Sequence, residues 1–236
     1  DKLPEDKAKR CALVMHTQVS DQHGTDLKAV KEAIFPEGNI FFSAKKITPQ
    51  QMNFMYNMAD VTTLLSSNEG WGLSLTESLM CGTMIVPNVS GGMQDQCRFE
   101  NEKGEWIDFD SDFPSNHRGT YTKCGTWAEP VFPANISLAG SPMTPYIFDD
   151  RCSPEDAAES LFKVYSLGKE ERNIRGMEGH KWVMSDEANM SSTAMGKKIG
   201  DCIDKAFNNF TPRKKYDIIK IDKLQPKKVT HKIYGY

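Results

Sequence analysis

The sequence has 236 residues, of which 39% are apolar and 26% are charged, and its net charge is −3. This length and composition favour a globular protein with one substantial core. No apolar run approaches the roughly 18 residues that a membrane span needs, and no secretory leader opens the chain, so we expect a cytoplasmic protein without a membrane span.

Strand-like and helix-like segments alternate from the start of the chain. Apolar runs predict strands at Cys11–His16 and Asn39–Ser43, and the segment between them predicts a helix over Asp26–Ile34. A further helix begins after Thr48 and runs to Met58, because the Thr-Pro-Gln-Gln run at its start has the composition of a capping box with proline in the first turn. This alternation is typical of a parallel, Rossmann-like α/β sheet flanked by helices.

The next segment predicts a compact βαβ unit with a right-handed crossover. It consists of a strand Val61–Ser66, a loop Ser67–Gly72, a short helix Leu73–Cys81 and a strand Met84–Pro87. We refer to residues 67–72 as the motif loop.

Between Met93 and Thr144 the periodicity is lost, which predicts a long irregular insertion. Structureless segments of this length are uncommon inside compact domains and are often functional. Aromatic faces can stack on sugars, but without periodicity we interpret those of the insertion as a small core of its own. They are Trp106, Tyr121, Trp127 and Phe132.

Two helices are predicted after the insertion, so we assign the main domain to residues 1–210. The first starts at Pro154, is capped by Ser153 and runs towards Gly168. Its predicted apolar face consists of Ala157, Ala158, Leu161, Phe162 and Tyr165. The second covers Ser192–Phe207 and is predicted to bury Met195, Ile199, Cys202 and Ile203.

The chain ends in a basic tail, residues 211–236, with eight Lys or Arg against two Asp. No nucleic-acid-binding motif accompanies the tail, so we interpret it as solvated or packed on a partner and expect no nucleic-acid binding. The six cysteines form no C-x-x-C pair and the histidines show no ligand spacing. Reduced thiols and no metal site are therefore expected.

The most informative stretch is N-E-G-W-G-L-S-L-T-E at residues 68–77, where a strand passes into a helix. Gly70 and Gly72 permit a tight backbone path, so the amides of Gly72 and Leu73 can point outward at the positive end of the helix and receive a diphosphate. Glu77 lies one turn further along, within reach of a ribose. Glu69 precedes the helix, on the side where a transferred sugar would lie.

This stretch resembles the glycosyl transferases group 1 family, retaining enzymes of GT-B architecture whose C-terminal domain carries E-G-F-G-L-x-x-x-E-A-M-A-x-G. Here the corresponding run is E-G-W-G-L at residues 69–73 followed by E-S-L-M-C-G at residues 77–82. The resemblance implies that Glu69 contacts the donor sugar and that Glu77 binds the ribose. It also implies that the amides of Gly72 and Leu73 receive the diphosphate, and that Gly70 and Trp71 belong to the same donor-binding run.

Two further segments extend the resemblance. The run S-G-G-M-Q-D at residues 90–95 is similar to the family's Gly-Gly turn and to the G-G-L-x-D turn of glycogen and starch synthases, which implies that Gly91 and Gly92 face the sugar and phosphates. Two glycines at a strand-to-helix corner can also have a purely structural role, but we favour the functional interpretation. By position, Lys46 and Ile47 would border the base, although lysines on a loop are usually just solvated.

The run P-Y-I-F-D-D at residues 145–150 is similar to the strand that follows the Gly-Gly turn in this family. Asp149 and Asp150 suggest a metal-binding D-x-D as an alternative. GT-B enzymes need no metal for donor binding, however, so the resemblance implies neither metal nor cofactor beyond the nucleotide sugar. The S-G-G-M-Q-D-Q run and the G-S-P-M-T-P-Y-I-F-D-D-R run also resemble uncharacterised transferases of aquatic viruses.

The resemblance covers roughly Cys11–Phe207 and stops short of a whole enzyme. The family's C-terminal domain begins one strand earlier, with an Arg and a Lys that grip the diphosphate, and an N-terminal domain supplies much of the acceptor site. Neither is found here, so we expect the donor-binding half of a transferase that acts on a glycan or another acceptor. A non-catalytic nucleotide- or glycan-binding module and a nucleotide-sugar epimerase are the alternatives, and the presence of both Glu69 and Glu77 favours transfer.

Overall fold

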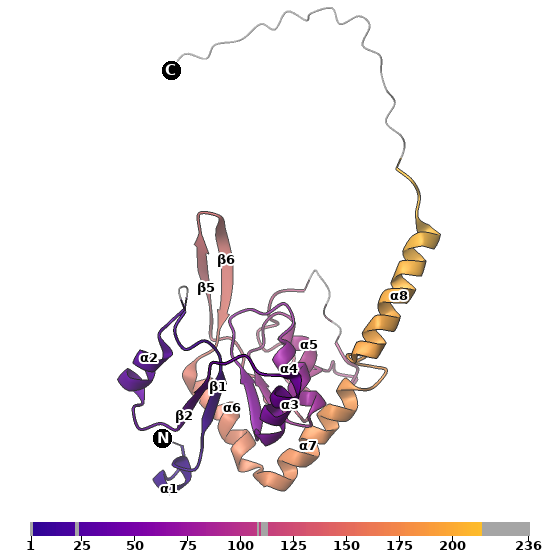
Figure 1. The fold of residues 1–236 in the computed structure, drawn as a ribbon. Coiled ribbons are helices and arrows are strands. Elements are labelled where there is room, and N and C mark those ends of the chain that lie inside the picture. The colour runs from indigo at the N-terminus through magenta and orange to yellow at the C-terminus, as the bar shows by residue number, and fades with distance from the viewer. Residues whose placement is uncertain (1, 22–23, 108, 110–112, 214–236) are drawn as a thin grey trace, which may run out of the picture. The chain divides into compact units, whose positions relative to one another are not determined.

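The structure is a computed structural model that describes residues 2–21, 24–107, 109 and 113–213 (Figure 1). It divides into two units, Asp1–Ser192 and Thr193–Tyr236. None of the described helices is both long enough and apolar enough to cross a membrane. Most of the basic tail predicted over residues 211–236 lies outside the described residues.

The alternating strands and helices predicted up to residue 87 are all present in the first unit, which confirms the α/β class. The boundaries differ from the prediction by at most two residues. In chain order the elements are α1 (Glu5–Ala8), β1 (Leu13–His16), α2 (Leu27–Ile34), β2 (Ile40–Ser43), α3 (Pro49–Met58), β3 (Val61–Leu64), α4 (Leu73–Met80), β4 (Met84–Pro87), α5 (Met93–Cys97), β5 (Asn135–Ser141), β6 (Thr144–Arg151), α6 (Pro154–Ser166) and α7 (Gly168–Val183).

The parallel strands form two separate pairs. β1 pairs with β2, with Leu13 opposite Ile40, and β3 pairs with β4, with Val61 opposite Met84. Within the described residues the two pairs are not hydrogen-bonded to each other. The β3–β4 pair is extended on its other side by residues 127–131, which run parallel to β4 and exchange backbone hydrogen bonds with it.

Local signals in the sequence explain why α3 starts where it does. The Thr48 hydroxyl accepts the amide of Gln51 (3.3 Å), and the Gln51 side chain accepts the amide of Thr48 (2.9 Å), so the predicted capping box is confirmed. Pro49 occupies the first helical position, where its missing N–H is of no consequence.

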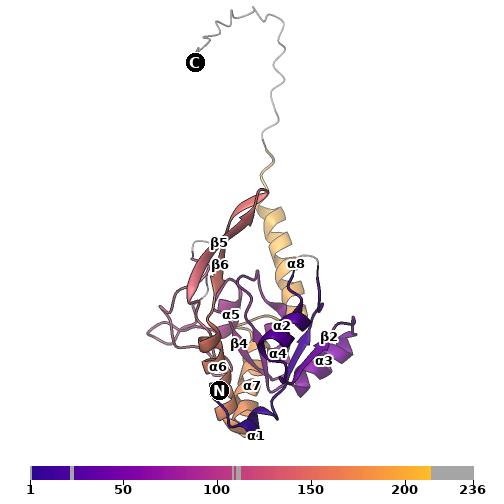
Figure 2. The same ribbon diagram turned by 90° about the vertical axis from the view of Figure 1, so that its left-hand side faces the viewer.

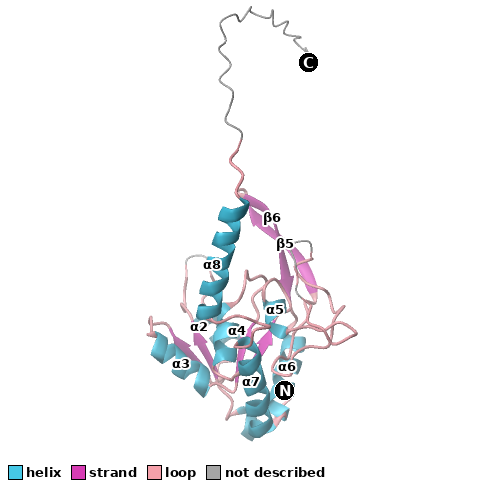
Figure 3. Ribbon diagram, turned by 90° about the vertical axis from the view of Figure 1, so that its right-hand side faces the viewer, coloured by secondary structure: helices cyan, strands magenta, loops and turns pink. Residues whose placement is uncertain are grey.

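Helix α4 is held at the centre of the first unit. It packs against α3 on one side and α7 on the other (Figure 3). Leu75 and Leu79 on α4 are fully buried, as are Ile85 and Val86 on β4. Gly176 allows α7 to approach closely, because a Cβ there would collide with the carbonyl oxygen of Gly82.

The region predicted as an irregular insertion contains regular structure at both ends, namely α5 and the antiparallel β5–β6 hairpin, which extends beyond the rest of the first unit (Figures 1 and 2). Its aromatic residues are core, as predicted, but the core is that of the whole unit. Trp127 is buried and stacks on Trp182 of α7, with ring centroids 4.9 Å apart. Trp106, Tyr121 and Phe132 pack against the same cluster.

The face of α6 that is buried differs from the predicted apolar face. Ala157 is buried as predicted, but the other buried residues are Ser160 and Val164. The neighbouring apolar positions Ala158, Leu161 and Tyr165 are exposed and Phe162 is half-buried. Ser160 can be buried because its hydroxyl donates to the carbonyl oxygen of Pro130 (3.3 Å).

The second unit is represented by α8 (Ser192–Asn209), which confirms the last predicted helix. Its predicted burial is wrong, since Met195, Ile199 and Ile203 are each at least half exposed and Cys202 is exposed too. Apolar periodicity identifies a face on a helix, but no second element within residues 193–213 exists to cover that face.

Candidate functional site

The motif loop brings the chain from β3 into α4 through a backbone conformation that requires glycine. Gly72 has φ 82° and ψ 60°, in the left-handed region, and it is buried. A Cβ at this position would lie 3.0 Å from Leu64 Cδ2 and 3.2 Å from Met93 Cγ. Both the conformation and the space therefore exclude a larger residue.

This path leaves the N-terminal end of α4 open. Among the described residues, no acceptor pairs with the amides of Gly72, Leu73 and Ser74, and no side chain caps the helix. Leu73 is 67% exposed, so the end of the helix is accessible to solvent. Unpaired amides at the positive end of a helix are suited to bind an anion such as a diphosphate.

A buried glutamine fixes the motif loop from the other side. The Gln96 side chain, from α5, donates to the carbonyl oxygens of Trp71 (2.6 Å) and Gly72 (3.1 Å). Its own oxygen accepts from the Thr76 hydroxyl (2.7 Å), which in turn accepts from the Trp71 indole (2.9 Å). Gln96 is fully buried and was not predicted as a site residue. Its only sequence signal was its place just after the Gly-Gly pair.

The glycine turn, residues 90–94, packs directly on the motif loop. The amide of Gly92 donates to the carbonyl oxygen of Glu69 (3.1 Å), and the amide of Gly91 donates to that of Ser115 (2.7 Å). A Cβ on Gly91 would collide with Glu69, and a Cβ on Gly92 would collide with Gly70. The pair therefore has a clear packing role. Its implied contact with sugar and phosphates stays a prediction.

Glu69 precedes the open helix end in the chain and Glu77 follows it. Glu69 is half-buried in the motif loop, and Glu77 is exposed on α4, one turn beyond Leu73. Glu77 has a partner that the sequence did not reveal, because the hydroxyl of Tyr56 on α3 donates to Glu77 Oε2 (2.8 Å). Burial and the neighbouring carboxylate raise the pKa of Tyr56 far above its usual value, so it remains a donor at neutral pH.

A second buried cluster connects the site to the hairpin. Asp150 on β6 is 1% exposed, and its two carboxylate oxygens accept from Ser90 (2.8 Å) and Asn116 (2.6 Å). Its amide donates to the carbonyl oxygen of Ser67 (3.0 Å). Both oxygens are thus engaged in holding loops together. Within the part of the chain that the structure describes, no group of three His, Cys, Asp or Glu could hold a metal ion.

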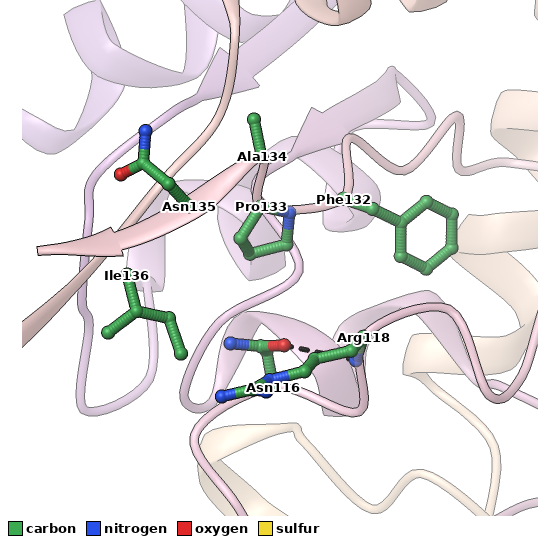
Figure 4. Close-up of a pocket in the computed structure, with 7 residues that line it drawn as sticks. All are labelled: Asn116, Arg118, Phe132, Pro133, Ala134, Asn135 and Ile136. Atoms are coloured by element: carbon green, nitrogen blue, oxygen red, sulfur yellow. Dashed lines mark hydrogen bonds between the residues drawn. The ribbon is translucent and has the colours of Figure 1, made fainter.

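The loop predicted to border the base follows β2. Lys46 is exposed and Ile47 is half-buried, and neither has an ion pair or side-chain hydrogen bond within the described residues. A pocket of about 340 Å³ lies elsewhere, at the start of β5, where the Arg118 side chain extends past Asn116 (Figure 4). None of the predicted donor-binding residues lines it. Its walls are Asn116, Arg118, Phe132, Pro133, Ala134, Asn135 and Ile136.

Comparison with known proteins relates part of the chain to one family. Residues 21–112, which include the motif loop, α4 and the glycine turn, match the family model described as glycosyl transferases group 1. No curated protein sequence matches the chain.

Among solved structures, sucrose-phosphate synthase from Thermosynechococcus elongatus matches with a TM-score of 0.55 and 15% identity, over 84% of this chain and 38% of that one. The catalytic domain of starch synthase IV from Arabidopsis thaliana, bound to ADP and acarbose, matches with a TM-score of 0.41 and 13% identity, over 74% of this chain and 28% of that one. The chain thus spans well under half the length of either.

Proposed function

We propose that the chain is a glycosyl transferase domain of GT-B fold, because residues 21–112 match the glycosyl transferases group 1 family model. It would bind a nucleotide-diphosphate sugar, the donor of a sugar transfer, at the N-terminal end of α4. The observation that carries the proposal is the pair of amides at Gly72 and Leu73 that have no acceptor among the described residues, with Glu69 just before them in the chain and Glu77 one turn after them. In this proposal the amides bind the diphosphate, Glu69 the sugar and Glu77 the ribose.

The proposed role of the amides is to stabilise the charge that develops during sugar transfer. When the glycosidic bond to the donor phosphate breaks, negative charge grows on the departing nucleoside diphosphate, and preorganised amides stabilise that charge without reorganisation. We assign Glu69 to positioning the sugar and Glu77 to the ribose hydroxyls. Retention of the anomeric configuration, and a base bordered by Lys46 and Ile47, are part of the proposal through the family resemblance.

We further propose that this chain is the donor-binding half of a larger enzyme. It spans 38% of the sucrose-phosphate synthase chain that it matches. Within the part of the chain that the structure describes, the β1–β2 pair and the β3–β4 pair share no hydrogen bonds, which fits a sheet without the strand that would join them. Acceptor binding and closure over the donor would then come from a second domain, so the 236-residue chain should bind nucleotides but transfer sugar slowly. Transfer at rates typical of enzymes by this chain alone would contradict the half-enzyme proposal.

Titration calorimetry with UDP, GDP and ADP tests the donor site. We expect at least one to bind and Glu77→Ala to weaken that binding by about 1–3 kcal/mol, as for the loss of a charged hydrogen-bond acceptor. Glu32→Ala is the matched control, since Glu32 is an exposed carboxylate on α2 with no ion pair within the described residues. Equal affinities for the two variants would remove Glu77 from the ribose role. A bound nucleotide located by crystallography away from Gly72 and Leu73 would reject the site.

A further inference from the structure

We infer that Tyr56 is a positioning residue that fixes the carboxylate of Glu77 for a ribose, so that the site selects ribonucleoside over deoxyribonucleoside diphosphates. The inference rests on the proposed donor site and adds to it a residue from a different helix. Nothing in the motif itself specifies this residue, because Tyr56 precedes the motif loop and lies on α3.

Tyr56 is held in place independently of its hydroxyl. Its carbonyl oxygen accepts from the Thr83 hydroxyl (2.8 Å) and from the amide of Ala59 (3.3 Å), and its ring is half-buried. Helix α3 is anchored at its other end by the capping box, and it packs against α4. The tyrosine hydroxyl therefore approaches Glu77 from a fixed scaffold, not from a mobile surface side chain.

The Tyr56 hydroxyl restrains Glu77 while leaving it able to bind. It donates its one proton to Glu77 Oε2, at 2.8 Å, whereas Oε1 has no partner among the described residues. Glu77 is exposed and would otherwise sample several rotamers, so ordering by a ligand would cost conformational entropy. With Tyr56 in place, part of that ordering is present before the ligand arrives.

It matters for ligand binding that a neutral hydroxyl, and not a cation, restrains the Glu77 carboxylate. No Lys or Arg among the described residues pairs with Glu77, so its negative charge is not neutralised. A tyrosine that stays protonated orders the carboxylate and leaves it a strong acceptor for neutral hydroxyl donors. The adjacent hydroxyls of a ribose are such donors, and a deoxyribose lacks at least one of them. A site built to hydrogen-bond a hydroxyl discriminates well against the analogue that lacks it.

The test compares Tyr56→Phe with wild type in calorimetric titrations of three probes. The probes are whichever of UDP, GDP and ADP binds most tightly, its 2′,3′-dideoxy analogue, and pyrophosphate. We expect Tyr56→Phe to weaken the ribonucleotide about three- to tenfold, and the other two by less than about twofold, because only the ribose hydroxyls meet Glu77. Tyr146→Phe is the matched control, since Tyr146 is 77% exposed and its hydroxyl has no partner within the described residues.

A double variant separates positioning from direct contact. If Tyr56 acts through Glu77, adding Tyr56→Phe to Glu77→Ala should cause no further loss of ribonucleotide affinity. Equal weakening of all three probes by Tyr56→Phe would show a merely structural role and overturn the inference, as would an unchanged ribonucleotide affinity. If wild type bound neither nucleotides nor pyrophosphate, the donor site itself would be rejected. If wild type bound nucleotides and pyrophosphate, but Tyr56→Phe did not weaken the ribonucleotide more than the dideoxy analogue, only the positioning role of Tyr56 would be rejected.

Discussion

Replacement of Gly92 by alanine would test whether the glycine turn and the motif loop are packed as closely as the structure has them. Gly92 has φ −66° and ψ −7°, a conformation that alanine adopts freely, so the substitution introduces no backbone strain. The added Cβ, however, would lie 2.7 Å from Trp71 Cα and closer still to the carbonyl oxygen of Gly70. Because these neighbours are backbone atoms, one of the two loops must move.

The expected loss of stability in Gly92→Ala follows from overpacking. Forcing a methyl group against a well-packed backbone typically costs about 1–3 kcal/mol, and displacement also weakens the hydrogen bond from the amide of Gly92 to the carbonyl oxygen of Glu69. We expect the free energy of unfolding in urea to fall by about that amount. Nucleoside diphosphate affinity should fall as well, since the motif loop carries the amides of the proposed phosphate site.

Gly70→Ala is the matched control for Gly92→Ala. Gly70 belongs to the same contact, but a Cβ on it would meet nothing within 4 Å, and its φ is not positive. Replacing a glycine of this kind by alanine does not lower the free energy of unfolding and often raises it by about 0.4–1 kcal/mol. If Gly92→Ala were as stable as Gly70→Ala in urea unfolding, the close approach of the two loops would be wrong.

Two other substitutions probe the surroundings of the site. Gln96→Leu removes the side chain that donates to the carbonyl oxygens of Trp71 and Gly72. We expect the free energy of unfolding in urea to fall by about 1–3 kcal/mol and nucleotide binding to weaken. Lower stability with unchanged binding would show that these hydrogen bonds do not shape the phosphate site. Burial lowers the pKa of His117 to about 4, so below pH 6.5 the unfolded chain takes up a proton that the native protein does not. The contribution of His117 to stability should then fall by at most about 1.4 kcal/mol per pH unit between pH 6.5 and 4. His117→Asn should therefore show a shallower pH dependence of unfolding between pH 6.5 and 5, and identical slopes would contradict the burial of a neutral imidazole.

Local sequence signals predicted the fold up to β4 because each signal acts within a few residues. The capping box at Thr48 and the left-handed Gly72 are properties of their own turn, and the alternation of strands and helices is a property of short segments. The motif that marks the site is local too, so Glu69 and Glu77 could be identified from the sequence.

The remaining features depend on contacts between distant segments. Helix α7 was missed because its buried positions include Gly176 and Gly179, which pack closely against other residues but carry no apolar signal. Tyr56 and Gln96 contact the motif from α3 and α5, and a single polar residue on another helix gives no indication of its partner. The exposure of Ile199 on α8 could not be predicted either, since periodicity does not reveal whether the covering surface belongs to the same chain.

The irregular insertion is part of the scaffold of the site, not an appendage. The carbonyl oxygen of Ser115 accepts from Gly91 in the glycine turn (2.7 Å), and the Asn116 side chain donates to the buried Asp150 (2.6 Å). Asp150 in turn joins β6 to the motif loop, because its amide donates to the carbonyl oxygen of Ser67 (3.0 Å). A carboxylate that is 1% exposed has lost its hydration, and hydrogen-bond donors replace it only while the insertion stays in place. Displacing the insertion would remove the Asn116 donor from this buried carboxylate and the Ser115 acceptor from the glycine turn that packs on the motif loop, so the two segments should unfold together and not one after the other.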